Sequence, residues 1–263
     1  MTIYFLGGGN MAEAIISGLY RSGSQETIHV TDPSAEKRAK LTTQYGVHTS
    51  NTLPELNEHD ILVLAVKPQD MQAACENVQH NNALIVSIAA GLPTTTLSHY
   101  LKDTQRLIRA MPNTPAKVGL GVTGLFAANG TNEQDKQRAQ SLFDASGQTV
   151  WLNNETQMHA ITAISGSGPA YVFYLLNALQ QAAQQQGFDA STARTLALHI
   201  FQGAAALAAQ SSEEFAVLQQ QVTSKGGTTQ AALTTFEQHQ IAENLNKGVQ
   251  AAAERSQELA KLP

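Results

Sequence analysis

The segment TIYFLGGGNMAEAI, Thr2 to Ile15, decides the fold of the first part of this chain. A short apolar run suited to a β-strand meets three consecutive glycines, and an amphipathic helical pattern follows at once. Gly7, Gly9 and Ala12 match the G-x-G-x-x-G/A pattern of a dinucleotide-binding turn. We expect the helix to begin near Asn10, with its N-terminal N–H groups and its dipole facing phosphates. A glycine turn without a ligand is the alternative that this motif alone leaves open.

Length and composition limit the classes of function. At 263 residues the chain is long enough for one or two domains with a substantial core. Its formal charge of -5 at pH 7, without a dense Lys/Arg run, argues against nucleic acid or an anionic membrane and favours a small-molecule partner. The single cysteine cannot form an internal disulfide and no signal-peptide pattern is present, so we expect a cytoplasmic protein. No apolar run approaches the ~20 residues of a membrane helix.

The two parts of the chain have different patterns. The first alternates short apolar runs with helical patterns, which is typical of βαβ units and a parallel sheet. The expected strands are TIYFL, TIHVT, ILVLAV, ALIVSIAA and RLIRA, with GVTGLFAA and QTVWL added around a helix over residues 133–143. Beyond Gln157 only helical periodicity remains. The sequence therefore predicts an α/β fold: a Rossmann-like doubly wound sheet over residues 1–155, and an all-α domain over 156–263. The thin core of the second domain favours homodimerisation through it.

Asp32 ends the second expected strand, where a carboxylate could accept hydrogen bonds from an adenosine ribose, and this favours NAD. Ser34, Lys37 and Arg38 follow, where a hydroxyl and two cations could instead hold the 2′-phosphate of NADP. Asp32 and Ser34 could also simply cap the next helix. All three interpretations stay open at the level of sequence.

Two further strand ends point to the same edge of the sheet. The chain turns through Lys67 and Pro68 on the carboxyl side, where open α/β sheets bind ligands. Lys67 could be a general acid, although a solvated or phosphate-facing charge is the more common role of such a lysine. Ala89, Ala90 and Gly91 end the next strand, and their small size would leave room for a nicotinamide ring.

The helical part has two glycine-rich segments at helix starts, ISGSGPAY and TSKGGTTQAAL. In the second, Gly226 and Gly227 would expose backbone N–H groups, and Thr228 and Thr229 add hydroxyls, which together suit a carboxylate. A capped helix start without a ligand is the alternative. The chain lacks HExxH, G-x-S-x-G and any Cys/His cluster with metal spacing, so we expect no metal site and no hydrolase of these types.

Six segments occur in one order along the chain: GGGNMAEAI, AVKPQ, SIAAG, RAMPNTPA, SGSGPAYV and SKGGTTQAAL. With them the chain closely resembles the Δ1-pyrroline-5-carboxylate reductases, over nearly its whole length. The resemblance implies a Rossmann domain, a helical dimerisation domain, and an active site completed by the helical domains of two subunits. It also implies that NAD(P)H reduces Δ1-pyrroline-5-carboxylate to L-proline, the last step of proline biosynthesis, and we favour NADPH over NADH.

The resemblance also implies roles for individual residues. The predicted cofactor contacts are Leu6, Gly7, Gly8, Gly9, Asn10 and Met11 at the pyrophosphate, Asp32, Ser34 and Asn51 at the adenosine end, and Ala65, Val66, Lys67, Pro68, Ile88, Ala89 and Ala90 along the nicotinamide half. The predicted substrate contacts are Ser224, Gly226, Gly227, Thr228 and Thr229. Thr229 is the predicted catalytic residue, with its hydroxyl near the ring nitrogen. One departure is Lys225, where the family pattern has proline.

Hydride attack on a cyclic imine gives an amine that takes a proton readily, so no strong acid or base is required. This agrees with Val172, which stands where related β-hydroxyacid dehydrogenases carry a catalytic lysine. The enzyme must instead align nicotinamide C4 with the imine carbon and anchor the carboxylate. A reductase of another small cyclic imine and a non-catalytic dinucleotide-binding regulatory protein are the alternatives.

Overall fold

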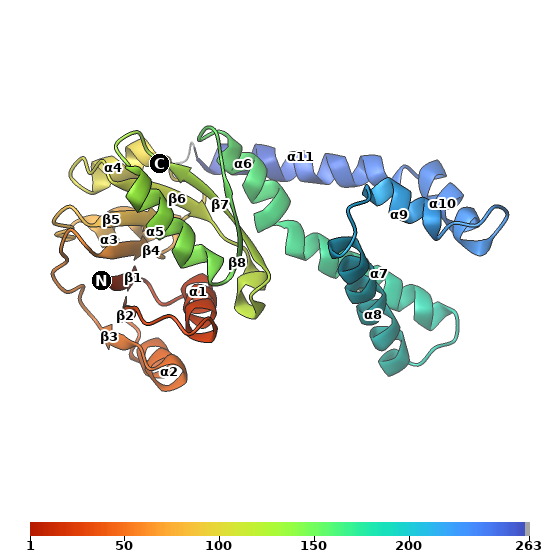
Figure 1. Ribbon diagram of the computed structural model, residues 1–263, viewed down its shortest axis with the longest axis horizontal. Coiled ribbons are helices and arrows are strands. Elements are labelled where there is room, and N and C mark those ends of the chain that lie inside the picture. The colour runs from red at the N-terminus through yellow and green to blue at the C-terminus, as the bar shows by residue number, and fades with distance from the viewer. Residues whose placement is uncertain (261–263) are drawn as a thin grey trace. The chain divides into compact units, whose positions relative to one another are not determined.

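The computed structural model describes residues 1–260 and divides the chain into two compact units (Figure 1). The first contains Met1–Pro169 together with residues 252–260, and the second contains Ala170–Ala251. The domain boundary expected between residues 155 and 156 stays a prediction. The C-terminal end of the last helix returns to the first unit, which the sequence pattern did not indicate.

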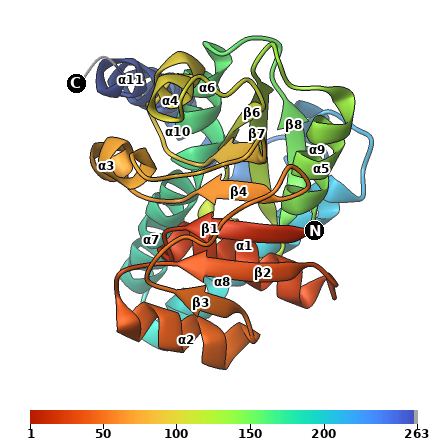
Figure 2. The ribbon, with the colours of Figure 1, turned by 90° about the vertical axis from the view of Figure 1, so that its left-hand side faces the viewer.

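The first unit is built on an eight-stranded sheet with the order β3-β2-β1-β4-β5-β6-β7-β8 (Figure 2). The strands are β1 (Thr2–Leu6), β2 (Thr27–Thr31), β3 (His48–Ser50), β4 (Ile61–Leu64), β5 (Leu84–Ser87), β6 (Leu107–Met111), β7 (Gly121–Ala127) and β8 (Gly147–Trp151). The pairs from β3 to β6 are parallel, β7 is antiparallel to β6, and β8 is parallel to β7. The expected Rossmann-like sheet is confirmed.

Helices cover both faces of this sheet, so its central strands are apolar on both sides. In β4, Ile61 and Val63 belong to one core, which α1 (Asn10–Arg21), α2 (Ala35–Tyr45) and α5 (Glu133–Asp144) cover. Leu62 and Leu64 belong to the other core, together with side chains of α3 (Met71–Cys75) and α4 (Thr94–Tyr100). All four residues of β4 are buried, as this two-faced packing requires.

The second unit is helical throughout, as expected. Its helices are α7 (Gly168–Gln185, which begins in the first unit), α8 (Ala190–Ala209), α9 (Phe215–Gln221), α10 (Thr228–Gln238) and α11 (Ile241–Leu259, which ends in the first unit). Among its residues only Ala193 and Ala197 are buried, while Phe173, Leu207 and Phe215 are 66%, 70% and 78% exposed. A chain with so many large apolar side chains in water requires a partner surface to cover them. None of the helices within residues 1–260 is long and apolar enough to cross a membrane.

The differences from the sequence predictions are short elements. β3 has three residues, α6 (Gln157–Ile161) has five, and α9 has seven, so none of them shows a clear periodicity. After Lys67 the chain forms a 3-10 turn, η1 (Pro68–Asp70), followed by the five residues of α3. A π-helical turn, η3 (Thr162–Gly166), joins α6 to α7, and such turns are frequent at functional sites.

Candidate active site

The turn after β1 requires its first glycine for two reasons. Gly7 has φ +105°, which side chains rarely adopt, and its N–H donates to the Thr31 carbonyl oxygen at 2.8 Å. An added Cβ would also lie 2.8 Å from the carbonyl oxygen of Ala65, which follows β4. The strand order reverses between β1 and β4, so this backbone contact lies at the switch point where open α/β sheets bind ligands.

Gly9 differs from Gly7, because no heavy atom lies within 4 Å of the position of an added Cβ. It is the N-cap of α1, and no side chain caps this helix. The first N–H groups of α1 therefore have no side-chain acceptor at the edge where the predicted residues Leu6 to Met11 lie. Open space beside a free helix N-terminus is the arrangement that accepts a phosphate group.

Asp32 is 4% exposed, and both oxygens of its carboxylate accept hydrogen bonds from backbone N–H groups. Its Oδ2 accepts a hydrogen bond from the Gly8 N–H at 2.8 Å, and its Oδ1 accepts one from the Ser34 N–H at 2.8 Å. Burial by itself would raise the pKa of Asp32, but these two bonds and the charge of Lys37 outweigh it and lower that pKa. Asp32 therefore anchors the glycine turn to the start of α2.

Ser34 is the N-cap of α2, because its Oγ accepts a hydrogen bond from the Lys37 N–H at 3.3 Å, as the capping interpretation predicts. Arg38 donates from Nη1 to the carbonyl oxygens of Asp32 and Pro33, at 2.6 and 3.0 Å. Lys37 is half exposed, with Nζ 3.4 Å from Asp32. These side chains gather at the ends of β2 and β3, which suits an anionic group at the predicted adenosine end.

Asn51, the other residue predicted at the adenosine end, follows β3 directly and is exposed. The Asp32 N–H donates to the Ser50 carbonyl oxygen at 3.2 Å, so the turns after β2 and β3 are joined by their backbones. Asn51 and Ser34 are therefore brought to the same corner of the sheet.

The predicted nicotinamide half follows the ends of β4 and β5. The Ala65 N–H donates to the Leu6 carbonyl oxygen at 2.8 Å, and the Ile88 N–H donates to the Leu64 carbonyl oxygen at 3.1 Å. Three strand ends are thus joined in one row along the edge. Lys67 is exposed and extended, with φ -67° and ψ 150°, and it leads into Pro68. Ala89 is buried and Ala90 is half-buried.

The predicted substrate residues lie in the second unit, at the start of α10. Gly226 has φ +74°, and Gly227 is the N-cap of α10, which no side chain caps. The Gly227 N–H donates to the Ser224 carbonyl oxygen at 3.0 Å, and the Gly226 N–H donates to Gln230 Oε1. The N–H groups of Thr228 and Thr229, in the first turn of α10, are therefore the open donors, rather than those of the two glycines.

Sequence reasoning missed a hydrogen-bonded link between two of the motifs. Asn113 of RAMPNTPA is 7% exposed, and its Nδ2 donates to both the carbonyl oxygen and the Oγ of Ser165, at 3.1 Å each. Its Oδ1 accepts from the Val122 N–H at 2.9 Å. All polar atoms of this buried amide are satisfied, so it fixes the SGSG segment to the turn after β6. The prolines on either side of Asn113 in RAMPNTPA indicate a stiff turn, but nothing in this segment indicates that Asn113 would bond to Ser165.

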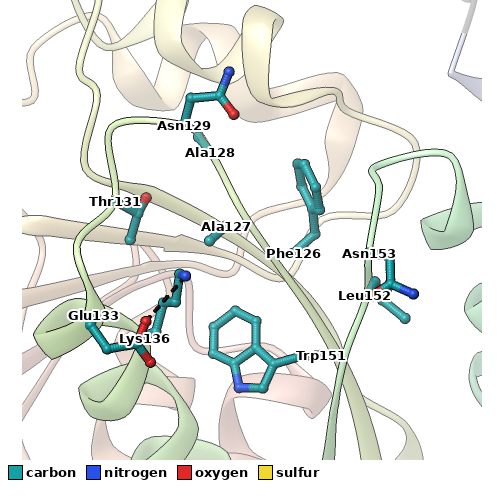
Figure 3. A pocket seen from close by; sticks show the side chains of 10 residues that line it. All are labelled: Phe126, Ala127, Ala128, Asn129, Thr131, Glu133, Lys136, Trp151, Leu152 and Asn153. Carbon is teal, nitrogen blue, oxygen red and sulfur yellow. Dashed lines mark hydrogen bonds and ion pairs between the residues drawn. The ribbon is translucent and has the colours of Figure 1, made fainter.

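A groove of about 480 Å³ lies elsewhere, at the ends of β7 and β8 and the start of α5 (Figure 3). Phe126 and Trp151 border it, and Lys136 pairs with Glu133 at 3.2 Å in its wall. Ala127, in this groove, pairs with Ile108 near the start of β6, so the groove lies at the amino ends of the parallel strands. It contains none of the predicted cofactor or substrate residues, and ligand binding at this edge is not indicated.

Other chemistries find little support among residues 1–260. No group of three or more His, Cys, Asp or Glu side chains is arranged to hold a metal ion there. Burial raises the pKa of the Cys75 thiol to about 11, so it is protonated at neutral pH and is a poor nucleophile.

Comparison with known proteins agrees with these features. Residues 2–91 match the family model described as NADP oxidoreductase coenzyme F420-dependent, and residues 155–259 match the one described as pyrroline-5-carboxylate reductase dimerisation. Among solved structures, a pyrroline-5-carboxylate reductase from Coxiella burnetii has a TM-score of 0.90 at 38% identity, covering 99% of both chains. A pyrroline carboxylate reductase from Plasmodium falciparum, solved with NADP bound, has a TM-score of 0.86 at 25% identity, covering 99% of this chain and 98% of that chain.

Sequence relatives extend over the same length. The pyrroline-5-carboxylate reductase of Haemophilus influenzae is 43% identical over 265 residues, which cover 99% of this chain and 98% of the relative. That of Pseudomonas aeruginosa is 39% identical over 264 residues, which cover 98% and 97%. The resemblance seen in the six motifs is confirmed, and the chain belongs to the pyrroline-5-carboxylate reductase family.

Proposed function

We propose that this chain reduces Δ1-pyrroline-5-carboxylate to L-proline, with NADPH, or less readily NADH, as the hydride donor. The observation that carries the proposal is the glycine turn at the switch point, where open space at Gly9 faces an uncapped helix N-terminus. It occurs in a chain 43% identical to a pyrroline-5-carboxylate reductase along nearly its full length.

The residues present fit the dinucleotide. The backbone of Leu6 to Met11 would hold the pyrophosphate through N–H groups and the dipole of α1. The backbone at 65–68 and 88–90 would follow the nicotinamide half, which supplies a hydride from C4 when bound. Ala89 and Ala90 leave the volume that a flat ring requires, and the two joined strand ends keep that surface fixed.

The surroundings of Asp32 favour NADPH over NADH. A carboxylate that binds the ribose of NAD must be accessible to its hydroxyls, but Asp32 is 4% exposed and both of its oxygens already accept backbone N–H bonds. Ser34 and Lys37 lie at the same corner with more exposure, and their hydroxyl and ammonium groups suit a phosphate. NADH would lack these contacts, so it would be the weaker donor.

The start of α10 would hold the substrate. Ser224, Gly226 and Gly227 shape the turn, and the open N–H groups at Thr228 and Thr229 would anchor the carboxylate at a helix N-terminus. The Thr229 hydroxyl would orient the ring nitrogen by a hydrogen bond. The nitrogen requires no strong acid from the protein, since an imine that arrives protonated becomes the amine directly. Lys225, which is exposed beside the turn, adds positive charge toward the carboxylate.

We propose a homodimer as the working form. The helical unit buries only two of its side chains within residues 170–251 and exposes many large apolar ones, which a second copy would cover. The match of residues 155–259 to a dimerisation model supports this. The net charge of -5 supports a small-molecule substrate over nucleic acid or an anionic membrane, and the single cysteine suits the cytoplasm as the site of action.

The decisive experiment is a steady-state assay that follows loss of reduced-nicotinamide absorbance with pyrroline-5-carboxylate and each reduced nucleotide in turn. We expect turnover with both nucleotides and a higher kcat/KM with NADPH. Other small cyclic imines should be poorer substrates. Protein that binds NADPH but oxidises it with no imine would identify a regulatory protein and refute the proposal.

A further inference from the structure

A second polar cluster lies in the first unit, beneath the loop that follows β5. Arg109 of β6 is 4% exposed, and its Nη1 donates a hydrogen bond of 2.8 Å to Oε1 of Glu155. Its Nε is buried without a hydrogen-bond partner among the described residues. The Glu155 side chain is 27% exposed, so only the arginine of this ion pair is fully buried. Burying a charged group costs solvation energy and such a pair contributes little net stability compared with apolar packing, so we ask what else the pair does.

Glu155 holds the beginning of α4. Its Oε1 accepts a hydrogen bond from the Thr94 N–H at 2.6 Å, and its Oε2 accepts one from the Thr94 hydroxyl at 2.9 Å. Thr94 is the first residue of α4, and Pro93 at the N-cap gives this helix no side-chain cap. Glu155 therefore caps α4 from 61 residues away in sequence, while Arg109 fixes the carboxylate that does so.

The loop between β5 and α4 is thus fixed at both ends. At its start, Ile88 is bonded to the end of β4, and the Ala89 N–H is 3.3 Å from Ser87 Oγ. Ser87 also lies directly beside Arg109 in the sheet register. Its other end is fixed by the two hydrogen bonds that Thr94 donates to Glu155. Three of its residues, Ile88 to Ala90, are those predicted to follow the nicotinamide half.

The back of this loop is formed by the end of α11. Gly91 is buried with φ +82°, and an added Cβ would lie 3.5 Å from the backbone of Leu259. One turn earlier, Ser256 Oγ lies 3.0 Å from Nδ1 of His159 on α6. Both ribbon views place α4, α6 and this end of α11 together (Figures 1 and 2). The loop therefore has a packed support behind it as well as fixed ends.

We infer that Glu155, held by Arg109, is a positioning residue for hydride transfer, because it fixes the loop Ile88–Pro93 against which the nicotinamide ring would lie. The inference rests on the proposed function. Misplacing a reacting group by about 1 Å can reduce a rate by about 100-fold, so a loosened loop lowers kcat. The pyrophosphate and adenosine contacts lie at other strand ends, so the affinity for NADPH depends much less on Glu155.

The test compares Glu155→Gln with Asp135→Asn in the full-length protein. Asp135 on α5 is 1% exposed and accepts two hydrogen bonds, at 2.8 and 2.7 Å, from Arg106, the residue that precedes β6. It therefore forms an ion pair with a neighbouring arginine at the opposite end of β6 from the loop, and its side chain is more buried than that of Glu155, which is 27% exposed. We expect Glu155→Gln to lower kcat about tenfold with a less than about twofold change in the KM for NADPH. Asp135→Asn should lower stability and leave kcat per folded molecule unchanged.

Thr94 supplies a second, milder set of variants. Thr94→Val removes only the hydroxyl bond to Glu155 and should lower kcat about threefold, while Thr94→Ser restores the hydroxyl and should restore kcat. These variants keep the inference testable if Glu155→Gln fails to fold. Equal kcat in Thr94→Val and Thr94→Ser, or an equal kcat loss in Asp135→Asn, would overturn it.

Backbone hydrogen exchange gives a readout that needs no turnover. Peptides that cover residues 88–97 should exchange about tenfold faster in Glu155→Gln than in the wild type, and should be unchanged in Asp135→Asn. If the wild type never reduces pyrroline-5-carboxylate, the proposed function fails, whereas unchanged exchange in Glu155→Gln refutes the role of Glu155 itself.

Discussion

The backbones of Gly7 and Ala65 touch, so that a Cβ atom on Gly7 would lie 2.8 Å from the Ala65 carbonyl oxygen. This contact joins the turn after β1 to the end of β4, where the strand order reverses. Gly9, two residues later, has no heavy atom within 4 Å of its own Cβ position. The two glycines of one motif therefore differ: the fold requires Gly7, whereas Gly9 borders the open space in which we propose that the pyrophosphate lies.

Gly7→Ala should destabilise the protein. The new methyl group would meet backbone atoms that cannot yield easily, and φ +105° is strained for alanine. We expect a loss of about 2–4 kcal/mol in the free energy of unfolding, measured by urea denaturation followed by circular dichroism. A variant with the midpoint and slope of the wild type would contradict the assigned role of Gly7.

Gly9→Val should fold and fail to bind the cofactor. A Cβ atom at this position has no heavy atom within 4 Å, so the free energy of unfolding should change by no more than about 1 kcal/mol. It would occupy the space beside the N-terminus of α1 and weaken NADPH binding by about 100-fold or more, as measured by calorimetric titration. Gly9→Ala is the graded control, with a smaller loss of affinity. Wild-type affinity in Gly9→Val would mean that the glycine run is only a turn.

Asp32 should make stability depend on acid pH. Burial favours a raised pKa, but the hydrogen bonds from Gly8 and Ser34 and the charge of Lys37 lower it. A carboxyl whose folded pKa is lowered stabilises the fold above its unfolded pKa of about 3.9, and this contribution is lost as the pH falls through the folded pKa. The free energy of unfolding should therefore fall more steeply below about pH 4 in the wild type than in Asp32→Asn.

At neutral pH, Asp32→Asn should be less stable than the wild type by about 1–3 kcal/mol, because an amide accepts only one of the two backbone N–H bonds. Urea denaturation at several pH values measures both effects. Parallel pH profiles for the two proteins would show that the carboxylate does not hold the glycine turn.

Thr229→Ala should lower turnover and leave the cofactor in place. The change removes the hydroxyl proposed to orient the ring nitrogen, while the N–H groups at the start of α10 remain. We expect kcat to fall about 10- to 100-fold with the dissociation constant of NADPH nearly unchanged. Thr229→Ser should recover most of the activity. An equal loss in turnover and in NADPH affinity would place Thr229 in the cofactor site or in the fold instead.

A charge in the helical unit should disrupt assembly. Leu207 on α8 is 70% exposed, and Leu120 in the first unit is 75% exposed, so neither substitution disturbs a buried core. If a second copy covers the helical unit, Leu207→Glu should shift the protein toward monomer, since an unpaired charge is costly in an apolar interface. Leu120→Glu is the control and should remain a dimer. Sedimentation equilibrium measures both, and a monomeric wild type would refute the dimer.

Much of the fold was predictable because it depends on short-range patterns. The bounds of β1 and β2 and the start of α1 at Asn10 agree with the expected elements, since alternation and helical periodicity follow directly from backbone geometry. β3 was not predictable, because HTS has no apolar pattern and becomes a strand only through its pairing with β2.

The sequence alone determined which residues could serve a dinucleotide and a small acid, because glycines, small residues and helix starts are local features. Only the tertiary structure decided which polar groups are already used. It showed that Asp32 accepts a hydrogen bond from the Gly8 N–H and that Gln230 accepts one from the Gly226 N–H. It also showed that Glu155 caps α4 by accepting from the Thr94 N–H. Such pairings form only when distant segments meet as the apolar faces are buried. The sequence around a carboxylate therefore does not show which N–H or O–H group will donate to it.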